Sequence, residues 1–250
     1  MRILLTGASS FTGYWFARTL VAQGHDVVAP LRGALDSYSE GVRALRVAKL
    51  REIVEVVDNS TFGDDRFMAL VKTGSFDALC HHAAQVGDYR SAGYDVSAAV
   101  SSNTRNIYPI LKSFCEQGGS TVILTGSVFE PNEGIGEMPL RAFSGYGLSK
   151  GITAEVVEHY ARQVGVNYGK FVIPNPFGPF EEPRFCSYLI KTWSKGETAR
   201  VNTPNYIRDN IHVEILSEVY SNFVATVSSA KNGGHYKIGP SGYVAVSYTH

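Results

Sequence analysis

Short apolar runs alternate along most of this 250-residue chain with segments in which apolar positions recur every three to four residues. The first kind is typical of strands buried on both faces, and the second of helices with one apolar side. This alternation predicts a repeated order of strand and helix over the first two thirds of the chain. The expected strands are 2–6, 26–29, 52–57, 76–80, 121–125 and 167–173. The expected helices are one through Phe16 and Leu20 that Gly24 closes, one within 33–50, and 66–72, 102–117 and 146–163.

Strands that alternate with helices predict an α/β fold with a doubly wound parallel sheet, covered by helices on both faces. The pattern changes after residue 173, where prolines and glycine at 174–179 interrupt regular structure. We therefore expect a dinucleotide-binding domain at 1–173 and a small C-terminal substrate lobe at 174–250 that is not an independent fold. Within that lobe we expect a helix at 187–195, short strands near Val201 and Ile207, a helix at 213–228 and a strand at 235–238.

Composition and charge narrow the classes of partner. The chain carries 23 Lys plus Arg and 23 Asp plus Glu, a balance that argues against nucleic acid or an anionic membrane as the main partner. No apolar run is long enough to span a bilayer, and the apolar first residues lead at once into a glycine, which indicates a strand and not a secretory signal. Cys80, Cys115 and Cys186 show no C-x-x-C spacing, so we expect reduced thiols in the cytoplasm.

A glycine-rich turn joins the first strand to the first helix. Its candidate cofactor contacts are Gly7, Ser10, Phe11 and Gly13, with a serine where a third glycine is usual in dinucleotide-binding turns. Backbone N–H groups at such a helix N-terminus bind pyrophosphate, and small residues let the phosphates approach. A plain tight turn is the alternative.

Residues at the ends of the second and third strands are candidates to contact the adenosine half of a dinucleotide. In NAD-binding proteins an acidic residue near the end of the second strand hydrogen-bonds the ribose 2′-hydroxyl. Here no acid is present, and Arg32 could instead face a 2′-phosphate, so we expect NADP in preference to NAD. Arg32 as a solvated loop cation is the alternative. Asp58 and Asn59 could bind adenine, or they could cap the next helix.

The fourth strand ends in two histidines and two alanines. Ala83 and Ala84 allow a cofactor ribose to approach closely. The paired histidines suggest a metal, but no further ligands follow at suitable spacing, so we expect none. Gln85 begins a polar and aromatic stretch, 85–97, which is a candidate substrate loop.

The last candidate chemistry is a tyrosine four residues before a lysine. On a helix, Tyr146 and Lys150 would share one face. A nearby ammonium favours phenolate, so we expect the pKa of Tyr146 to be lowered, which suits an acid/base acting on a carbinol oxygen. The alternative is an ordinary helix start exposed to solvent. Ser127 follows a strand, and Gly7 does too, so these groups should meet at the carboxyl edge of the sheet.

These segments occur together in a known order. Thr6-Gly-x-x-x-x-x-Gly13, His81-x-Ala83-Ala84, Ser127, Tyr146-x-x-x-Lys150, Asn175-x-x-Gly178-Pro179 and Arg208-Asp209-x-Ile211-His212-Val213 follow one another along the chain. The chain thereby resembles the extended short-chain dehydrogenase/reductases, in particular their NAD(P)-dependent nucleotide-sugar epimerase, dehydratase and reductase group, whose fold is Rossmann-like.

The resemblance implies a role for each matching residue. Tyr146 would be the acid/base, Lys150 would hold the nicotinamide ribose, and Ser127 would bind the same substrate oxygen as Tyr146. A second register, counted back from Val128-Phe129, would give that place to Thr125. Asn103 would support Lys150, with helix capping as its alternative. Gln85, Asn175 and Arg208 would contact the nucleotide-sugar substrate.

The resemblance also implies a reaction, which is hydride transfer at a sugar carbon, C4 in the first instance. The family's 4,6-dehydratases carry an Asp-Glu pair directly after the catalytic threonine; neither Thr125 nor Ser127 is followed by one, which argues against a dehydratase. The expected cofactor, NADP, favours a 4-ketoreductase over an epimerase. A non-catalytic NAD(P)-binding scaffold and a reductase of a small non-sugar ketone are the alternatives.

Two further expectations come from the resemblance. The first is a homodimer that pairs the helices around 103–117 and 146–163. The second concerns the C-terminal lobe, because family members continue beyond the point that corresponds to Gly239. Either this lobe is pared down or the chain is shortened.

Overall fold

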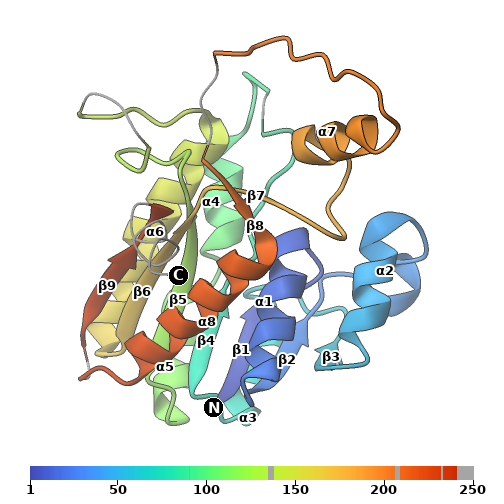
Figure 1. Cartoon of the computed structure of the whole chain (residues 1–250). Coiled ribbons are helices and arrows are strands. Elements are labelled where there is room, and N and C mark those ends of the chain that lie inside the picture. The colour runs from blue at the N-terminus through green and yellow to red at the C-terminus, as the bar shows by residue number, and fades with distance from the viewer. Residues whose placement is uncertain (90, 135–137, 206–208, 232, 241–250) are drawn as a thin grey trace.

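A computed structural model describes residues 1–240 of the chain except 90, 135–137, 206–208 and 232 (Figure 1). Its centre is a seven-stranded sheet in the order β3-β2-β1-β4-β5-β6-β9. Every neighbouring pair in this sheet runs parallel. The strands are β1 (Arg2–Thr6), β2 (Asp26–Pro30), β3 (Glu55–Val57), β4 (Ala78–His81), β5 (Thr121–Ser127), β6 (Asn167–Ile173) and β9 (His235–Ile238).

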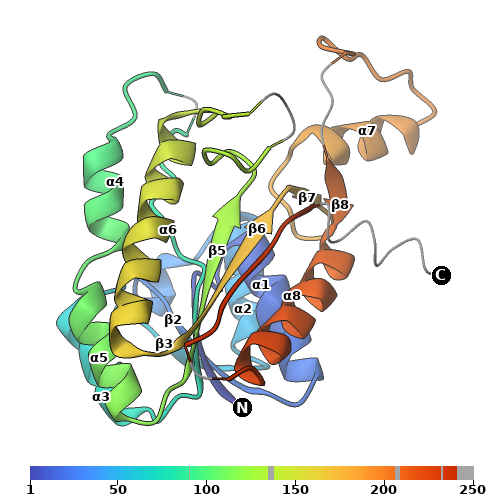
Figure 2. The same cartoon turned by 90° about the vertical axis from the view of Figure 1, so that its left-hand side faces the viewer.

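Helices cover both faces of the sheet, which confirms the doubly wound α/β prediction (Figure 2). Alternate side chains of one strand enter opposite cores: Ile3 and Leu5 pack in one apolar cluster and Leu4 in the other. The first cluster is covered by α1 (Phe11–Ala22), α2 (Gly41–Leu50) and α8 (Val213–Ser228). The second is covered by α3 (Asp65–Thr73), α5 (Ile107–Glu116) and α6 (Gly145–Val164), with α4 (Val96–Asn103) beside α6.

The single helix expected at 102–117 is wrong, because the chain forms two helices there. α4 starts inside the expected loop, where Asp95 accepts the Ala98 N–H at 2.9 Å, and it ends at Asn103. Asn106 takes a left-handed conformation, φ 55°, and its amide donates to Gly63 O at 2.8 Å. Asn tolerates this conformation better than most residues, so it interrupts the helix before α5 begins.

The C-terminal third differs from expectation in three places. The segment expected to be irregular contains β7 (Asn175–Phe177), which pairs in parallel with β8 (Asn210–His212) in a small second sheet. No strand forms near Val201 among the described residues, and Ile207 lies outside them. The strand expected at 235–238 joins β6 in the main sheet, so it does not belong to a separate lobe. Pairing with β6 satisfies the backbone groups along one side of this edge strand.

Only part of the C-terminal third therefore stands apart from the sheet. The helix α7 (Phe185–Trp193) lies above the carboxyl ends of the strands, whereas α8 packs on α1 and on β6 (Figure 1). A short 3-10 helix, η1 (Leu35–Ser37), precedes α2.

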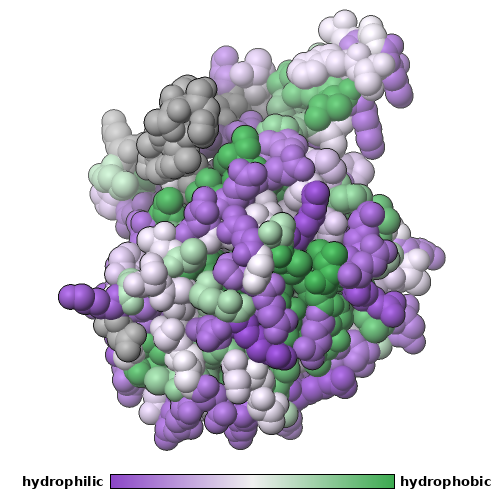
Figure 3. Space-filling model, turned by 60° about the horizontal axis from the view of Figure 1, so that its bottom comes forward, coloured by the Kyte–Doolittle hydropathy of each residue, from purple (hydrophilic) through white to green (hydrophobic). Residues whose placement is uncertain are grey.

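The surface shows no large apolar face in the view with the bottom of the molecule forward. Hydrophilic residues spread over it between smaller hydrophobic patches (Figure 3). Within the described residues, no helix is both long and apolar enough to cross a membrane. Of the three cysteines, Cys80 is buried, Cys186 half-buried and Cys115 exposed.

Candidate active site

A cavity of about 1420 Å³ opens at the carboxyl ends of the strands, beneath α7. Its wall contains residues predicted for cofactor, for substrate and for catalysis. These residues are Gly7, Ser10, Phe11, Arg32, Ala83, Ala84, Gln85, Asn103, Thr125, Ser127, Tyr146, Lys150 and Asn175. Gly13, Asp58 and Asn59 do not line it, and Arg208 lies outside the described residues.

The turn between β1 and α1 needs its two glycines for space. Gly7 has φ 76°, and a Cβ there would lie 2.8 Å from Ala83 N. A Cβ at Gly13 would lie 2.2 Å from Gly7 O. Ser10 stands where a third glycine is usual because it is the N-cap of α1, and its Oγ accepts the Gly13 N–H at 3.1 Å. The turn forms a close-fitting backbone cradle at a helix N-terminus, which suits a pyrophosphate.

Both histidines at the end of β4 have protein partners. His81 contacts Thr6 Oγ1 through Nδ1 and Asn103 O through Nε2, both at 3.0 Å. His82 Nε2 lies 3.1 Å from Ser10 Oγ and 2.9 Å from Thr12 Oγ1. Desolvation lowers the pKa of His81 to about 4 and that of His82 to about 3, so both are neutral at pH 7. Their rings tie β4 to the glycine turn.

No group of three or more His, Cys, Asp or Glu side chains that could hold a metal occurs among the residues the structure describes. The histidine nitrogens named above instead bond hydroxyl and carbonyl oxygens of the protein.

Arginines line the end of the cavity that contains the glycine turn, the expected cofactor end, and the sequence pattern indicated only Arg32 among them. Arg32 is exposed on the cavity wall. Arg43 of α2 also lines it and donates to Ser9 Oγ at 2.8 Å. Arg46 is 1% exposed and donates from Nε to Ser9 O at 3.1 Å. Their three-residue spacing on the helix after β2 places Arg43 and Arg46 on one side of that helix, and this spacing is the signal in the sequence that could have identified them.

The end of β3 does not cap the next helix, and adenine binding by Asp58 and Asn59 stays a prediction. Asp58 pairs with Arg66 at 3.1 Å, and the next helix is capped by Asp64, so Asp58 and Asn59 do not cap it. The cavity wall at this point is formed by Ser60, Thr61 and Phe62.

Tyr146 and Lys150 occupy the first two turns of α6. Ser144 caps this helix and accepts the Gly147 N–H at 3.3 Å. Lys150 is 3% exposed, and its Nζ donates to Thr125 O. Burial lowers the pKa of Lys150, and the Glu130 carboxylate opposes that shift.

The pKa predicted for Tyr146 is wrong in direction. Burial raises the pKa of the phenol well above its usual range, and the negative charge of Glu130 raises it further. The Lys150 ammonium is bound to the Thr125 carbonyl, and desolvation dominates. Tyr89 and Tyr94 stand around the ring, with centroids 6.2 Å and 6.3 Å away. The phenol is therefore protonated at neutral pH.

Ser127 and Thr125 both border the cavity but differ in their partners. Ser127 Oγ accepts the Phe129 N–H at 3.2 Å. Thr125 is 2% exposed, and its hydroxyl oxygen is buried. This arrangement favours Ser127 as the hydroxyl that a substrate would meet.

Asn103 and Asn175 have structural partners beside the cavity. Asn103 Oδ1 accepts the Gln85 N–H at 2.7 Å, and its Nδ2 donates to Thr153 Oγ1 at 3.3 Å. It thus positions Gln85 and the third turn of α6, not Lys150 directly. Asn175 donates from its backbone N to Asp209 O at 3.0 Å, which joins β7 to the start of β8.

The geometry agrees with a comparison against protein families. A family model described as the NAD dependent epimerase/dehydratase family matches residues 3–239. The chain belongs to this family. It is thus an enzyme of the NAD-dependent epimerase/dehydratase family, and its match covers nearly all of the described residues. No curated protein matches the sequence closely enough to count as a relative.

Solved structures share the fold of this epimerase/dehydratase family member. A UDP-glucose 4-epimerase from Thermotoga maritima, in complex with UDP-glucose, has a TM-score of 0.72 at 19% identity, over 96% of this chain and 77% of that chain. A dTDP-glucose 4,6-dehydratase from Streptomyces venezuelae has a TM-score of 0.70 at 21% identity, over 96% of this chain and 76% of that chain. At these identities the likeness shows the fold, and both reactions occur among its neighbours.

Proposed function

We propose that this protein transfers hydride to or from a sugar carbon, C4 in the first instance, of a nucleotide-linked hexose. The observation that carries the proposal is that Tyr146, Lys150 and Ser127 line the same cavity as the glycine cradle and Asn175. A cofactor fits the cradle because Gly7 and Gly13 leave space that any Cβ would fill. The bound nicotinamide would supply or accept the hydride.

The chain's own residues would handle the proton. Tyr146 would donate its phenolic proton to the oxygen of a ketone as that carbon is reduced, since the phenol is protonated at neutral pH. Ser127 Oγ would hydrogen-bond the same oxygen. Lys150, held at the Thr125 carbonyl, would anchor the nicotinamide ribose with its remaining donors. A protonated phenol suits the reduction of a ketone, a step that a 4-ketoreductase and an epimerase share. The expected preference for NADP is what favours a 4-ketoreductase over an epimerase.

We propose NADP as the preferred cofactor. Arg32 and Arg43 both line the cofactor end of the cavity, and guanidinium groups suit a 2′-phosphate. Asp58 pairs with Arg66 and does not line the cavity.

The experiment that tests the function compares consumption of reduced cofactor with turnover. A nucleotide 4-ketosugar should consume NADPH in stoichiometric amount if the enzyme is a reductase. An epimerase would interconvert nucleotide hexoses with no net change in cofactor. If nucleotide diphosphates gave no thermal protection in the presence of NADP, the nucleotide-sugar assignment would be abandoned in favour of a small non-sugar ketone.

From the family resemblance we also propose a cytoplasmic homodimer that pairs α4, α5 and α6 with their mates. Tyr108, Leu148 and Ile152 on α5 and α6 are 38%, 40% and 39% exposed. Light scattering on the wild type and on Ile152→Glu tests it, since a charge at a dimer interface should give monomers.

A further inference from the structure

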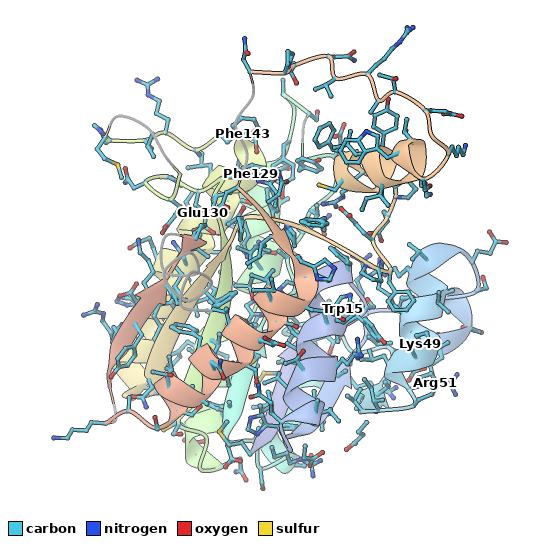
Figure 4. The ribbon with its side chains drawn as sticks, viewed as in Figure 1. Trp15, Lys49, Arg51, Phe129, Glu130 and Phe143 are labelled. Atoms are coloured by element: carbon cyan, nitrogen blue, oxygen red, sulfur yellow. The ribbon has the colours of Figure 1, made fainter. Side chains whose placement is uncertain are left out.

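Glu130 is a buried acid next to the proposed catalytic groups, and no role has been assigned to it above. It lies three residues after Ser127, just beyond β5, and its side chain is 0% exposed. Figure 4 shows it with Phe129 and Phe143 near the upper ends of the strands and of α6. It does not line the cavity, so it would not touch a substrate.

The Glu130 carboxylate has two specific partners. Oε1 accepts the backbone N–H of Ser127 at 2.7 Å, and Oε2 lies 2.7 Å from Lys170 Nζ. Lys170 also lies 2.7 Å from Glu133, which lies 3.2 Å from Lys237. A buried charge without such partners would be strongly destabilising, so the network accounts for how a carboxylate persists here.

The strands are built to hold this pair. Lys170 of β6 is in register with Leu124 of β5 and with Lys237 of β9. A Cβ on Gly126 would lie 3.0 Å from Lys170 Cε and 3.1 Å from Glu130 Oε1. Glycine at 126 therefore leaves room for the ion pair directly behind the backbone that presents Ser127.

Charged and titratable groups from several elements surround Tyr146 and Lys150, and Glu130 is one of them. The Tyr146 phenol interacts with Glu130, with Tyr94 from the loop before α4, and with Arg184 before α7. The Lys150 ammonium interacts with Glu130 and Lys170, and with His81 and His82, which are neutral. Glu130 is a carboxylate whose charge reaches both groups, and it lies against the start of α6, since a Cβ on Gly151, next to Lys150, would be 3.9 Å from Glu130 Cβ.

We propose that Glu130 is a positioning residue, which Lys170 holds in place so that its carboxylate fixes the Ser127 backbone and supplies negative charge behind Tyr146 and Lys150. The chemical part of this inference rests on the proposed role of Tyr146. Burial is the larger cause of the raised pKa of Tyr146, and the charge of Glu130 raises it further; the same charge opposes the fall that burial causes in the pKa of Lys150. The backbone bond keeps Ser127 where its hydroxyl meets the same oxygen as Tyr146.

The test is an alkaline titration of Tyr146 in Glu130→Gln. Glutamine keeps an oxygen for the Ser127 N–H and removes the charge. Phenolate absorbance is recorded against pH for each protein minus its Tyr146→Phe counterpart, with circular dichroism to mark unfolding. Removing a nearby negative charge favours phenolate, so we expect the Tyr146 midpoint to fall by about 1 pH unit.

Glu133→Gln is the matched control, because it removes the other carboxylate on Lys170 without touching Ser127. The titration midpoint of Tyr146 in Glu133→Gln should equal that of the wild type. If Glu130→Gln does not fold, Glu130→Gln with Lys170→Met removes both charges of the pair, and a smaller fall is expected, because losing the Lys170 charge opposes the effect of losing the Glu130 charge. A Glu130→Gln or double variant in which Tyr146 ionises no earlier than in wild type overturns the proposal, as does an equal fall in Glu133→Gln.

Turnover separates this inference from the proposed function. If a nucleotide sugar is a substrate, the alkaline limb of kcat should move to lower pH in Glu130→Gln by the same amount as the titration. If the titration shifts but no nucleotide sugar turns over, the proposed substrate fails while the role of Glu130 stands.

Discussion

Cations stand behind both ends of the cavity, with Arg46 1% exposed and the Lys170 side chain 14% exposed, and their partners differ. Arg46, behind the cofactor end, donates to Ser9 O at 3.1 Å, to Phe180 O at 2.6 Å and to Glu182 at 2.5 Å. Lys170, behind the catalytic end, is bound by two carboxylates. Arg46 thus joins backbone segments that are far apart in the sequence, while Lys170 balances charge beside groups that titrate.

The comparison indicates two uses of a buried charge. A guanidinium with several donors in a plane can bridge the glycine turn and the segment before α7, which an ammonium could not do equally well. Lys170, at the proposed catalytic end, bridges no backbone segments in this way, and its positive charge balances the Glu130 and Glu133 carboxylates. We therefore expect changes at Arg46 to act on stability and cofactor binding, and changes at the catalytic end to act on proton transfer. Figure 4 shows Trp15, Lys49 and Arg51 near α1 and α2, on the side away from Glu130.

The largest effect should come from Tyr146→Phe. Loss of the proton donor should lower turnover about 100- to 10,000-fold while cofactor affinity and thermal stability stay near wild type. Single-turnover kinetics and cofactor titration measure this. Near-normal turnover would remove Tyr146 from the mechanism and with it the catalytic half of the comparison.

Arg46→Met should be the most destabilising change at the cofactor end. It leaves two buried carbonyls and Glu182 without their donor, and we expect a loss of about 4 kcal/mol in unfolding free energy. Urea unfolding measures it. Arg43→Met, three residues away on the exposed side of α2, is the control and should cost about 0.5 kcal/mol or less.

Lys170→Met should cost slightly less, about 3 kcal/mol, because it leaves the buried Glu130 carboxylate without its cation, whereas Glu133 keeps Lys237. Adding Glu130→Gln should restore at least half of that loss, since the charge is then removed with its partner. Adding Glu182→Gln to Arg46→Met should restore little, because the two carbonyls remain unpaired. If Glu130→Gln and Glu182→Gln restored equal fractions of the lost unfolding free energy, Lys170 and Arg46 would not differ in the way described.

The smallest effect concerns the choice of cofactor. Arg32→Ala should weaken NADP binding about tenfold, or about 1.4 kcal/mol, and change NAD binding little, because only NADP carries a 2′-phosphate. Arg51→Ala, at the far end of α2, is the control. Equal losses for NADP and NAD would make Arg32 a solvated loop cation.

Sequence periodicity predicted most of the elements because a strand between two helix layers must be apolar throughout and a helix must be apolar on one side. It failed where single residues decide the path, as at Asn106, and where pairing partners are distant, as for β7 with β8 and β9 with β6. Such pairings depend on which strand edge is available, and no local pattern records that.

For the site, local spacing placed Gly7, Ser127, Tyr146 and Lys150 on one cavity wall, because parallel strands bring their carboxyl ends together. It missed Arg43 and Arg46, and it gave the wrong direction for the pKa of Tyr146. A pKa depends on burial and on every charge in reach, and Glu130 reaches Tyr146 only once the loop after β5 has folded back.

By itself, the sequence determined the alternation of buried strands and amphipathic helices, the glycine turn and the four-residue spacing of Tyr146 and Lys150. These depend on short-range geometry, which neighbouring residues specify. The tertiary structure alone decided that Arg46 bridges two distant backbone segments and that Glu130 and Lys170 form a buried pair behind Ser127. Such contacts join residues far apart in the chain, and their electrostatic effect exists only when folding removes water from between them.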